Sequence, residues 1–297
     1  MTRVAMLGTG VMGSAMARRV AGAGHGVTAW SRPLADAEPL LAEGIAVRAT
    51  AAAAVDGADL VVTMVPDAAA IESFAEGPDG FLDAMAPDAV WVQCSTVGVE
   101  AADRLVALAE RHAVTIADAP VLGSKVPAEQ GELIMLASGS DAALDRCTPL
   151  FDAVASEVVR VGPAGKGSRM KMVTNTWIMA AVASVAEAMA LAEALDVDGG
   201  LFLRAIAGTA IDMGYAQSKG AMIVAREFPV HMSLDNGAKD ARLALAAARD
   251  HGLPGSVIAA VAELMQKAAD AGHGGVDMAA AFHAAVARKQ GETGGMG

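Results

Sequence analysis

A pattern of three glycines near the N-terminus constrains the fold of this chain more than any other feature. Gly8, Gly10 and Gly13 are spaced as G-x-G-x-x-G, after an apolar run at 4–7 and at the start of a helical pattern at 11–23. In this strand–turn–helix context the first glycine permits the tight turn, the second admits a pyrophosphate close to the backbone, and the third allows close helix–strand packing. The helix N-terminus adds amide donors and the positive end of its dipole. We therefore predict a dinucleotide site, rather than a glycine-rich turn without a ligand, over Gly8, Thr9, Gly10, Val11, Met12 and Gly13.

The first half of the chain alternates strand-like and helix-like segments. Short apolar runs predict strands at 27–30, 60–65, 90–93, 114–118, 133–137 and 158–161, with alanine-rich helical segments between them. This alternation is typical of parallel βαβ units. After the glycine-rich stretch 162–167 the strand pattern ends, and helices are predicted at 171–195, 201–207, 216–225, 235–250, 256–271 and 279–289, before a frayed tail at 291–297. We predict an α/β fold with a nucleotide-binding domain over 1–164 and an all-helical domain over 165–297.

The end of the second predicted strand bears on which nucleotide is bound. An NAD enzyme usually carries Asp or Glu there, where the carboxylate binds the ribose 2′-hydroxyl. This chain reads Ala29-Trp30-Ser31-Arg32-Pro33 at that point, without a carboxylate. Arg32 offers a guanidinium to a 2′-phosphate, and Ser31 offers a hydroxyl donor. The pattern predicts NADP as the cofactor; the alternative is that Arg32 is a solvated surface arginine.

A second group of candidate residues opens the longest predicted helix. Lys171 and Asn175 are four residues apart and therefore share one helix face. The neighbours Met170, Met172 and Val173 are apolar, which favours a partly desolvated lysine that serves as general acid or base. Asn175 would orient the lysine or bind substrate. The alternative is a surface lysine whose stem lies along apolar side chains.

A third candidate segment follows the strand predicted at 114–118. It reads Asp118-Ala119-Pro120-Val121-Leu122-Gly123-Ser124-Lys125, and a turn at the carboxyl edge of such a sheet is where ligands bind. The backbone amides of Gly123 and Ser124 are candidates for holding a substrate carboxylate. The alternative is an ordinary tight turn.

Together these stretches resemble the β-hydroxyacid dehydrogenase family, of the 3-hydroxyisobutyrate dehydrogenase type, over essentially the whole chain. In this resemblance Lys171 takes the place of the catalytic lysine, Ser95-Thr96 matches a pair that closes over the nicotinamide, and Lys239-Asp240 matches a fourth motif. The resemblance implies a Rossmann domain, an all-helical domain joined to it by a long helix, and a homodimer or homotetramer formed through the helical domains. It also implies hydride transfer between NADP(H) and a small hydroxy acid, aldehyde or keto acid.

The resemblance completes the expected set of site residues. Beside the glycine motif, Ser31 and Arg32, the expected cofactor contacts are Val65, Pro66, Thr96 and Lys239. The expected substrate contacts are Ser95, Leu122, Gly123, Ser124, Lys171, Asn175 and Asp240.

Within the family, the run 119–129 looks most like the branch that reduces glyoxylate and succinic semialdehyde with NADPH. One position departs from the usual pattern: Leu122 stands where the commonest segment has a serine whose hydroxyl helps to hold the substrate carboxylate. Leucine cannot donate a hydrogen bond, so a larger or less polar carbonyl substrate is favoured. Two other functions stay open, an imine reductase on the same fold and a non-catalytic NADP-binding regulatory protein; Lys171 and Asn175 favour the dehydrogenase.

Charge, cysteine content and histidine spacing bear on the partners, the compartment and the metals expected for this protein. With 22 Lys and Arg against 34 Asp and Glu, the net charge of −12 disfavours a nucleic-acid partner. The longest uncharged helical stretch, 172–186, is shorter than the ~20 residues of a membrane span, so we expect a buried helix and no membrane partner. Two cysteines, Cys94 and Cys147, and the lack of a secretory pattern indicate the cytoplasm. The six histidines have no metal-ligand spacing, so no metal is expected.

Overall fold

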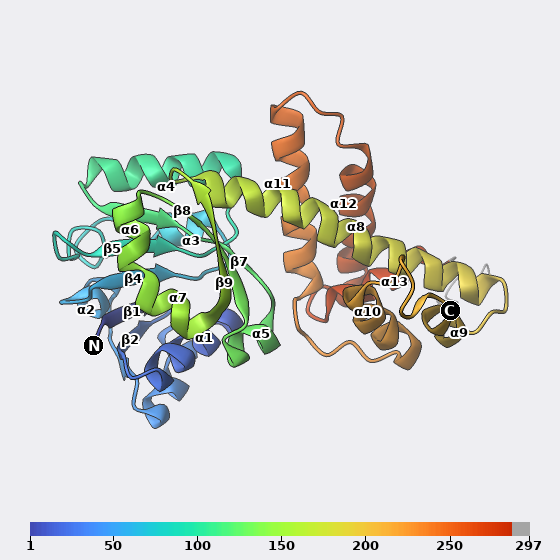
Figure 1. Cartoon of the computed structure of the whole chain (residues 1–297), viewed down its shortest axis with the longest axis horizontal. Helices are drawn as coiled ribbons and strands as arrows, with labels where there is room; N and C mark the ends of the chain where they lie inside the picture. Colours follow the sequence, from blue (N-terminus) through green and yellow to red (C-terminus); the bar gives the residue numbers. More distant parts are fainter. Residues whose placement is uncertain (287–297) are drawn as a thin grey trace, which may run out of the picture. The chain divides into compact units, whose positions relative to one another are not determined.

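The computed structural model describes residues 1–286 of the chain (Figure 1). By packing, the chain divides into an N-terminal unit that ends at Thr174 and a C-terminal unit that begins at Asn175. The tail predicted at 291–297 and the end of the helix predicted at 279–289 lie outside the described residues. The domain boundary predicted at residue 165 stays a prediction.

The N-terminal unit is built on one sheet. Its strands are β1 (Arg3–Leu7), β2 (Gly26–Trp30), β3 (Ala46–Val47), β4 (Leu60–Thr63), β5 (Val90–Gln93), β6 (Thr115–Asp118), β7 (Val121–Leu122), β8 (Leu133–Ser138) and β9 (Ala155–Gly162). The order is β3-β2-β1-β4-β5-β6-β8-β7, with β9 beside β8. The first six strands in this order pair in parallel. This is the Rossmann order, so the predicted Rossmann domain is confirmed.

The prediction of parallel βαβ units is wrong at one place. β8 runs antiparallel to β6, and β7 pairs antiparallel with β8. The chain between β6 and β8 is taken up by β7 and a helix of one to two turns, so it folds back as a hairpin rather than crossing over the sheet. The carboxyl end of β6 and the turn after β7 therefore stay close together in the chain.

Helices cover both faces of this sheet because alternate strand residues point to opposite sides. Val4 and Met6 of β1 belong to one buried core, whereas Ala5 and Leu7 belong to the other. The first core includes residues of α1 (Val11–Gly22), α5 (Lys125–Gln130), α6 (Asp141–Arg146) and α7 (Thr148–Val154). The second includes residues of α2 (Ala51–Val55), α3 (Ala68–Glu72) and α4 (Val99–Arg111). Two 3₁₀ helices that the sequence did not predict, Leu34–Asp36 and Glu38–Glu43, lie between β2 and β3.

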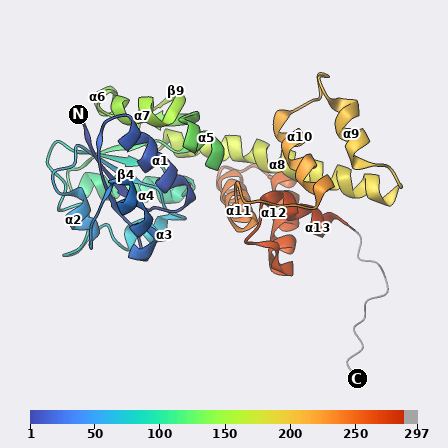
Figure 2. The same ribbon diagram turned by 90° about the horizontal axis from the view of Figure 1, so that it is seen from below.

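The C-terminal unit consists of helices, and after β9 the residues up to 286 contain no further strand, as predicted. Its elements are α8 (Lys166–Ala194, whose first nine residues belong to the N-terminal unit), α9 (Gly199–Ile206), α10 (Gly214–Ala225), α11 (Leu234–Asp250), α12 (Ser256–Ala268) and α13 (Phe282–Ala285). α11 and α12 lie side by side (Figures 1 and 2). The helix predicted from residue 279 is instead a 3₁₀ turn, Met278–Ala281, followed by α13. All four residues of that turn are fully buried.

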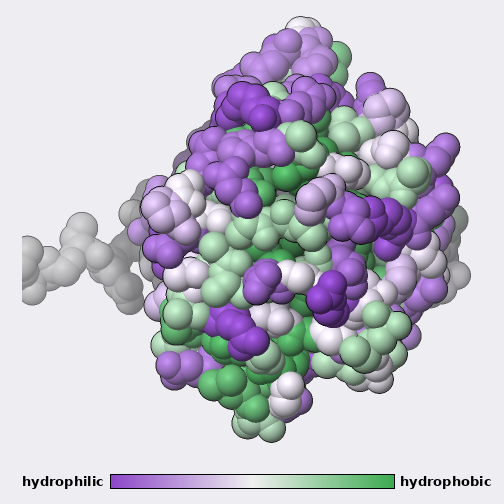
Figure 3. All heavy atoms as spheres, turned by 90° about the vertical axis from the view of Figure 1, so that its left-hand side faces the viewer, coloured by the Kyte–Doolittle hydropathy of each residue, from purple (hydrophilic) through white to green (hydrophobic). Residues whose placement is uncertain are grey.

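The long helix α8 is long and apolar enough to cross a membrane by length and composition alone, a test that a core helix also passes. Its residues Met179, Val182 and Ala186 are buried, but Trp177 is 68% exposed and Leu191 59% exposed. The prediction of a buried helix over 172–186 therefore holds for one face of α8 only. Elsewhere the surface is mixed, and the face drawn in Figure 3 shows groups of hydrophobic residues among hydrophilic ones.

Candidate functional site

The glycine motif forms the turn between β1 and α1, and its three glycines have two different roles. Gly8 has φ of +101°, and a Cβ there would lie 2.4 Å from the carbonyl oxygen of Met64. A Cβ on Gly13 would lie 1.9 Å from the carbonyl oxygen of Gly8. Apart from its own neighbours along the chain, no atom of the described residues lies within 4 Å of the position that a Cβ would take on Gly10. Packing thus requires glycine at 8 and 13, whereas Gly10 leaves open space beside the backbone.

The residues around this open space fit a dinucleotide. The N-cap of α1 is Gly10, without a capping side chain and without an acid in the first turn, so the amides at the start of the helix can serve an anion. The Thr9 hydroxyl is buried and has no hydrogen-bond partner among the described residues. The backbone amide of Thr9 donates to the Ser31 hydroxyl at 3.3 Å, which ties the loop to the end of β2. Val11 is half exposed on the first turn, and Met12 packs against the core.

A cavity of about 440 Å³ opens at the end of β2. Arg32 lines it, is exposed, and donates from Nη1 to the Ser73 hydroxyl at 3.3 Å. Its guanidinium carbon lies 5.8 Å from the centre of the Trp30 ring. Glu76 also lines the cavity, but a carboxylate oxygen of Glu76 is 2.8 Å from Nε2 of His112. The hydrogen bond to Glu76, and a second one to Asp83, raise the pKa of His112.

The carboxyl ends of β4 and β5 meet at the same edge of the sheet. The Ser95 hydroxyl accepts from the amide of Val65 at 2.9 Å and donates to the carbonyl of Thr63 at 3.3 Å. Ser95 is 1% exposed, so its hydroxyl holds Val65 in place; its predicted contact with substrate stays a prediction. Thr96 and Val65 are half-buried at this edge and Pro66 is exposed.

The structure brings Lys171 onto the third candidate segment. Lys171 is 9% exposed, and its Nζ donates to the carbonyl oxygen of Val121 at 2.8 Å. Leu122 is half-buried and pairs with Ile134 of β8, while Gly123 turns the chain with φ of +115°. Ser124 follows in extended conformation as the N-cap of α5. Two stretches about fifty residues apart in sequence thus form one site in the N-terminal unit, and Lys171 is not a solvated surface lysine.

In the C-terminal unit, Asn175, Asp240 and Lys239 form a network. The Asn175 side-chain amide donates to Oδ2 of Asp240 at 3.0 Å, and Nζ of Lys239 lies 2.9 Å from Oδ1 of the same carboxylate. Asn175 is 1% exposed and Asp240 3% exposed. Asn175 follows Lys171 by one turn of α8.

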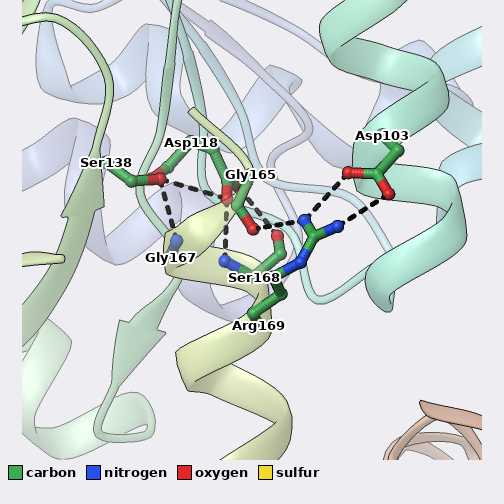
Figure 4. A network of polar contacts seen from close by, with 7 residues as sticks. All are labelled: Asp103, Asp118, Ser138, Gly165, Gly167, Ser168 and Arg169. Carbon is green, nitrogen blue, oxygen red and sulfur yellow. Dashed lines mark hydrogen bonds and ion pairs between the residues drawn. The ribbon is translucent and has the colours of Figure 1, made fainter. Parts of the chain in front are cut away.

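The sequence predicted Asp118 only as the first residue of the third candidate segment. In the structure its carboxylate, at the end of β6, contacts the start of α8 (Figure 4). Its carboxylate accepts from both the backbone amide and the hydroxyl of Ser168, each at 2.7 Å. Burial raises the pKa of Asp118, and the hydrogen bonds from Ser168, Gln93 and Ser138 oppose that rise. The signal in the sequence was weak, because an acid at a strand end does not identify a partner fifty residues away.

Two other expectations concern metals and cysteines. The part of the chain that the structure describes contains no group of three or more His, Cys, Asp or Glu side chains placed to hold a metal ion. Cys94 and Cys147 are free and buried, and burial raises the pKa of each thiol. Cys94 is therefore a small core residue rather than a nucleophile.

Comparison with known proteins accounts for both parts of the chain. A family model described as the NAD binding domain of 6-phosphogluconate dehydrogenase matches residues 3–162. A second, described as NAD-binding of NADP-dependent 3-hydroxyisobutyrate dehydrogenase, matches residues 165–285.

Similar proteins cover the chain almost completely. Glyoxylate/succinic semialdehyde reductase 2 of Arabidopsis thaliana is 29% identical over 97% of this chain and 81% of its own length. The 3-sulfolactaldehyde reductase of Escherichia coli K12 is 28% identical over 94% of each chain. The crystal structure of 3-hydroxyisobutyrate dehydrogenase from Salmonella typhimurium superposes with a TM-score of 0.87, at 28% identity, over 95% of this chain and 99% of that one.

The Rossmann unit, its glycine loop and these relatives define the class of protein: an oxidoreductase that uses NAD or NADP. More closely, the chain belongs to the 3-hydroxyisobutyrate dehydrogenase family of β-hydroxyacid dehydrogenases, as its motifs predicted. It is an NAD(P)-dependent hydroxyacid dehydrogenase or reductase.

Proposed function

We propose that this enzyme reduces a small aldehyde or keto acid with NADPH, reversibly, and that Lys171 is its general acid and base. The observation that carries the proposal is the buried Lys171 ammonium, 2.8 Å from the Val121 carbonyl oxygen in the predicted substrate segment. A lysine withdrawn from water and directed by a hydrogen bond is suited to proton transfer at a fixed position.

A nicotinamide cofactor would supply the hydride when bound. Lys171 donates a proton to the carbonyl oxygen of the substrate during reduction and accepts it back during oxidation. Its ammonium also stabilises the negative charge that develops on that oxygen. The hydrogen bond to Val121 sets the direction of the lysine side chain.

The other predicted residues hold the substrate and the cofactor. Asn175 positions the reacting oxygen or the lysine, and Asp240 orients Asn175 through the 3.0 Å hydrogen bond. The backbone amides of Gly123 and Ser124 bind the anionic end of the substrate. Thr96 and Lys239 contact the cofactor.

The substrate class follows from Leu122 and from the relatives. The names of two relatives, glyoxylate/succinic semialdehyde reductase and 3-sulfolactaldehyde reductase, specify aldehydes that carry an acidic group. Leu122 is half-buried beside the turn and offers apolar area instead of a hydroxyl. We therefore infer an aldehyde with an acidic group separated from the carbonyl by several carbons, in preference to glyoxylate.

NADP is proposed over NAD because the end of β2 carries Arg32 and no acid. The guanidinium lies on the wall of the cavity beside that strand end, where a 2′-phosphate would be bound by a charge-assisted hydrogen bond. The open space at Gly10 and the uncapped start of α1 support binding of the pyrophosphate.

We also propose a homo-oligomer formed through the C-terminal unit. That unit exposes large apolar side chains, with Trp177 at 68%, Leu195 at 65% and Ile211 at 76%. Exposed apolar side chains that gather into one patch are typical of a surface covered by another protein chain. The molar mass in solution, measured by light scattering, tests this proposal. The cytoplasm and the absence of a membrane partner stay predictions from the sequence.

The test of the proposed reaction is a steady-state assay of NADPH oxidation with a panel of small aldehydes, keto acids and one cyclic imine. Lys171→Met keeps the length of the side chain and removes the ammonium, so kcat should fall by about 10²–10⁴-fold while NADPH still binds. Lys166→Met, which replaces an exposed lysine of the same helix, is the matched control. Reduction of the imine alone would favour the imine reductase, and turnover unaffected by Lys171→Met would refute the proposed role.

A further inference from the structure

We propose that Asp118 is a positioning residue for Lys171. Its buried carboxylate sets the register of the first turn of α8 against the segment that receives the lysine ammonium. The inference rests on the proposed function of Lys171 and adds a residue that acts through it.

Both oxygens of the Asp118 carboxylate are engaged. Oδ2 accepts from the amide of Ser168 at 2.7 Å and lies 3.3 Å from the Ser138 hydroxyl. Oδ1 accepts from the Ser168 hydroxyl at 2.7 Å and from the Gln93 side-chain amide at 3.4 Å. Asp118 is 2% exposed and faces the positive end of the α8 dipole, so the carboxylate holds the start of the helix strongly.

The same short segment contacts α8 again one turn later. Ser168 and Lys171 are three residues apart on one face of the helix, and Val121 follows Asp118 by three residues. The carboxylate of Asp118 therefore holds the backbone at Ser168, and the carbonyl of Val121 holds the ammonium of Lys171. A shift of the helix relative to β6 would move the lysine against the carbonyl that directs it.

Glycine at position 167 lets the start of α8 approach the backbone of the sheet closely. A Cβ on Gly167 would lie 2.2 Å from the carbonyl of Leu136 and 2.5 Å from that of Asp118. The amide of Gly167 donates to the Ser138 hydroxyl at 2.8 Å. The start of α8 is thus seated directly on the backbone of the sheet, and the position of the helix is defined by these contacts.

Attachment of α8 alone does not require a buried charge. The next residue, Arg169, already forms a two-pronged ion pair with Asp103 of α4, with both distances at 2.8 Å and both groups partly exposed. Burying a carboxylate costs desolvation free energy, and well-packed apolar side chains often stabilise a protein as much as a buried ionic contact does. What the carboxylate adds is direction, because hydrogen bonds to both oxygens allow one register only.

The experiment compares Asp118→Asn, Lys171→Met and the double variant in NADPH-dependent turnover, with NADPH binding measured separately. Asn is nearly isosteric but presents an amide hydrogen to a donor in place of one acceptor oxygen. We expect kcat to fall by about 10²-fold, the scale of a misplacement near 1 Å, with the NADPH dissociation constant changed less than about twofold. In the Lys171→Met background the Asp118 substitution should cause no further loss. Asp103→Asn removes the outer ion pair of the same turn and should leave kcat near that of the wild type.

Each outcome decides the inference. If Asp118→Asn lowers kcat by the same factor with and without Lys171, the aspartate acts independently of the lysine and the inference is overturned. The inference is also overturned if Asp103→Asn lowers kcat as much as Asp118→Asn does. If Asp118→Asn does not fold, Ser168→Ala removes the hydroxyl contact alone, and its smaller loss of kcat should likewise vanish in the Lys171→Met background. If Lys171→Met itself keeps full turnover, the proposed function fails first, and the inference fails with it.

Discussion

Replacing Arg32 with alanine should remove most of the preference for NADPH over NADH. The guanidinium is exposed at the wall of the cavity beside β2, where Ser73 and the Trp30 ring hold it in place. NADH has no 2′-phosphate, so only NADPH loses a contact when the guanidinium is removed. One charge-assisted hydrogen bond contributes about 1.5–3 kcal/mol.

That free energy corresponds to a roughly 10- to 150-fold increase in the dissociation constant of NADPH. Because Arg32 is exposed, salt screens the interaction, and the lower part of the range is expected at physiological ionic strength. Ser73→Ala should weaken NADPH binding less, because it removes only the hydroxyl that positions the guanidinium.

The assay is a fluorescence titration of NADPH and NADH against the wild type, Arg32→Ala and Ser73→Ala. Arg146→Ala is the matched control, because it removes an exposed arginine of the same unit, and with it the same charge. Equal affinities of the wild type for NADH and NADPH would refute the reasoning. So would a loss that Arg32→Ala causes equally for both cofactors, since that would reflect a damaged site rather than a lost phosphate contact.

Three further predictions concern the substrate segment and the C-terminal unit. Leu122→Ser should raise kcat/KM for glyoxylate relative to kcat/KM for succinic semialdehyde, because each buried methylene of a substrate contributes about 0.8 kcal/mol. If the ratio of the two kcat/KM values changes less than about twofold, Leu122 does not face the substrate. Lys219→Met should lower the free energy of unfolding, measured in urea, by about 3–5 kcal/mol, because it leaves the Asp277 carboxylate buried without its partner. Asp277 is 0% exposed and lies 2.7 Å from the lysine Nζ. A loss of stability no larger than that of an exposed lysine variant would contradict this prediction. Burial lowers the pKa of His283, and the nearby charges of His273 and Arg226 lower it further. At acidic pH the unfolded chain therefore binds more protons than the folded chain does, so the free energy of unfolding should fall as the pH drops below 6.5. His283→Asn should show a flatter pH dependence of the unfolding midpoint, and an unchanged slope would assign the effect to other groups.

Local sequence patterns predicted most of the fold because they report local physics. The glycine spacing identified the β1–α1 turn, since a Cβ at 8 or 13 would overlap a carbonyl oxygen. Alternating strand and helix patterns identified every strand of the sheet except the two-residue strands β3 and β7, which are too short to show a pattern. The errors fall where tertiary packing overrides the pattern. β8 was expected to be parallel, and the fully buried turn at Met278–Ala281 was expected to be a helix.

The sequence by itself determined the class of fold, the dinucleotide loop and the identity of the candidate residues. Each of these depends on residues within a few positions of one another, whose spacing reflects the helix and strand periods. Only the tertiary structure decided which of these residues meet. It placed Lys171 on the carbonyl of Val121, and it showed that Asp118 holds the start of α8 through Ser168. Both contacts join residues fifty positions apart, and burial and direction at such a distance arise from the packing of α8 on the sheet, which no local pattern encodes.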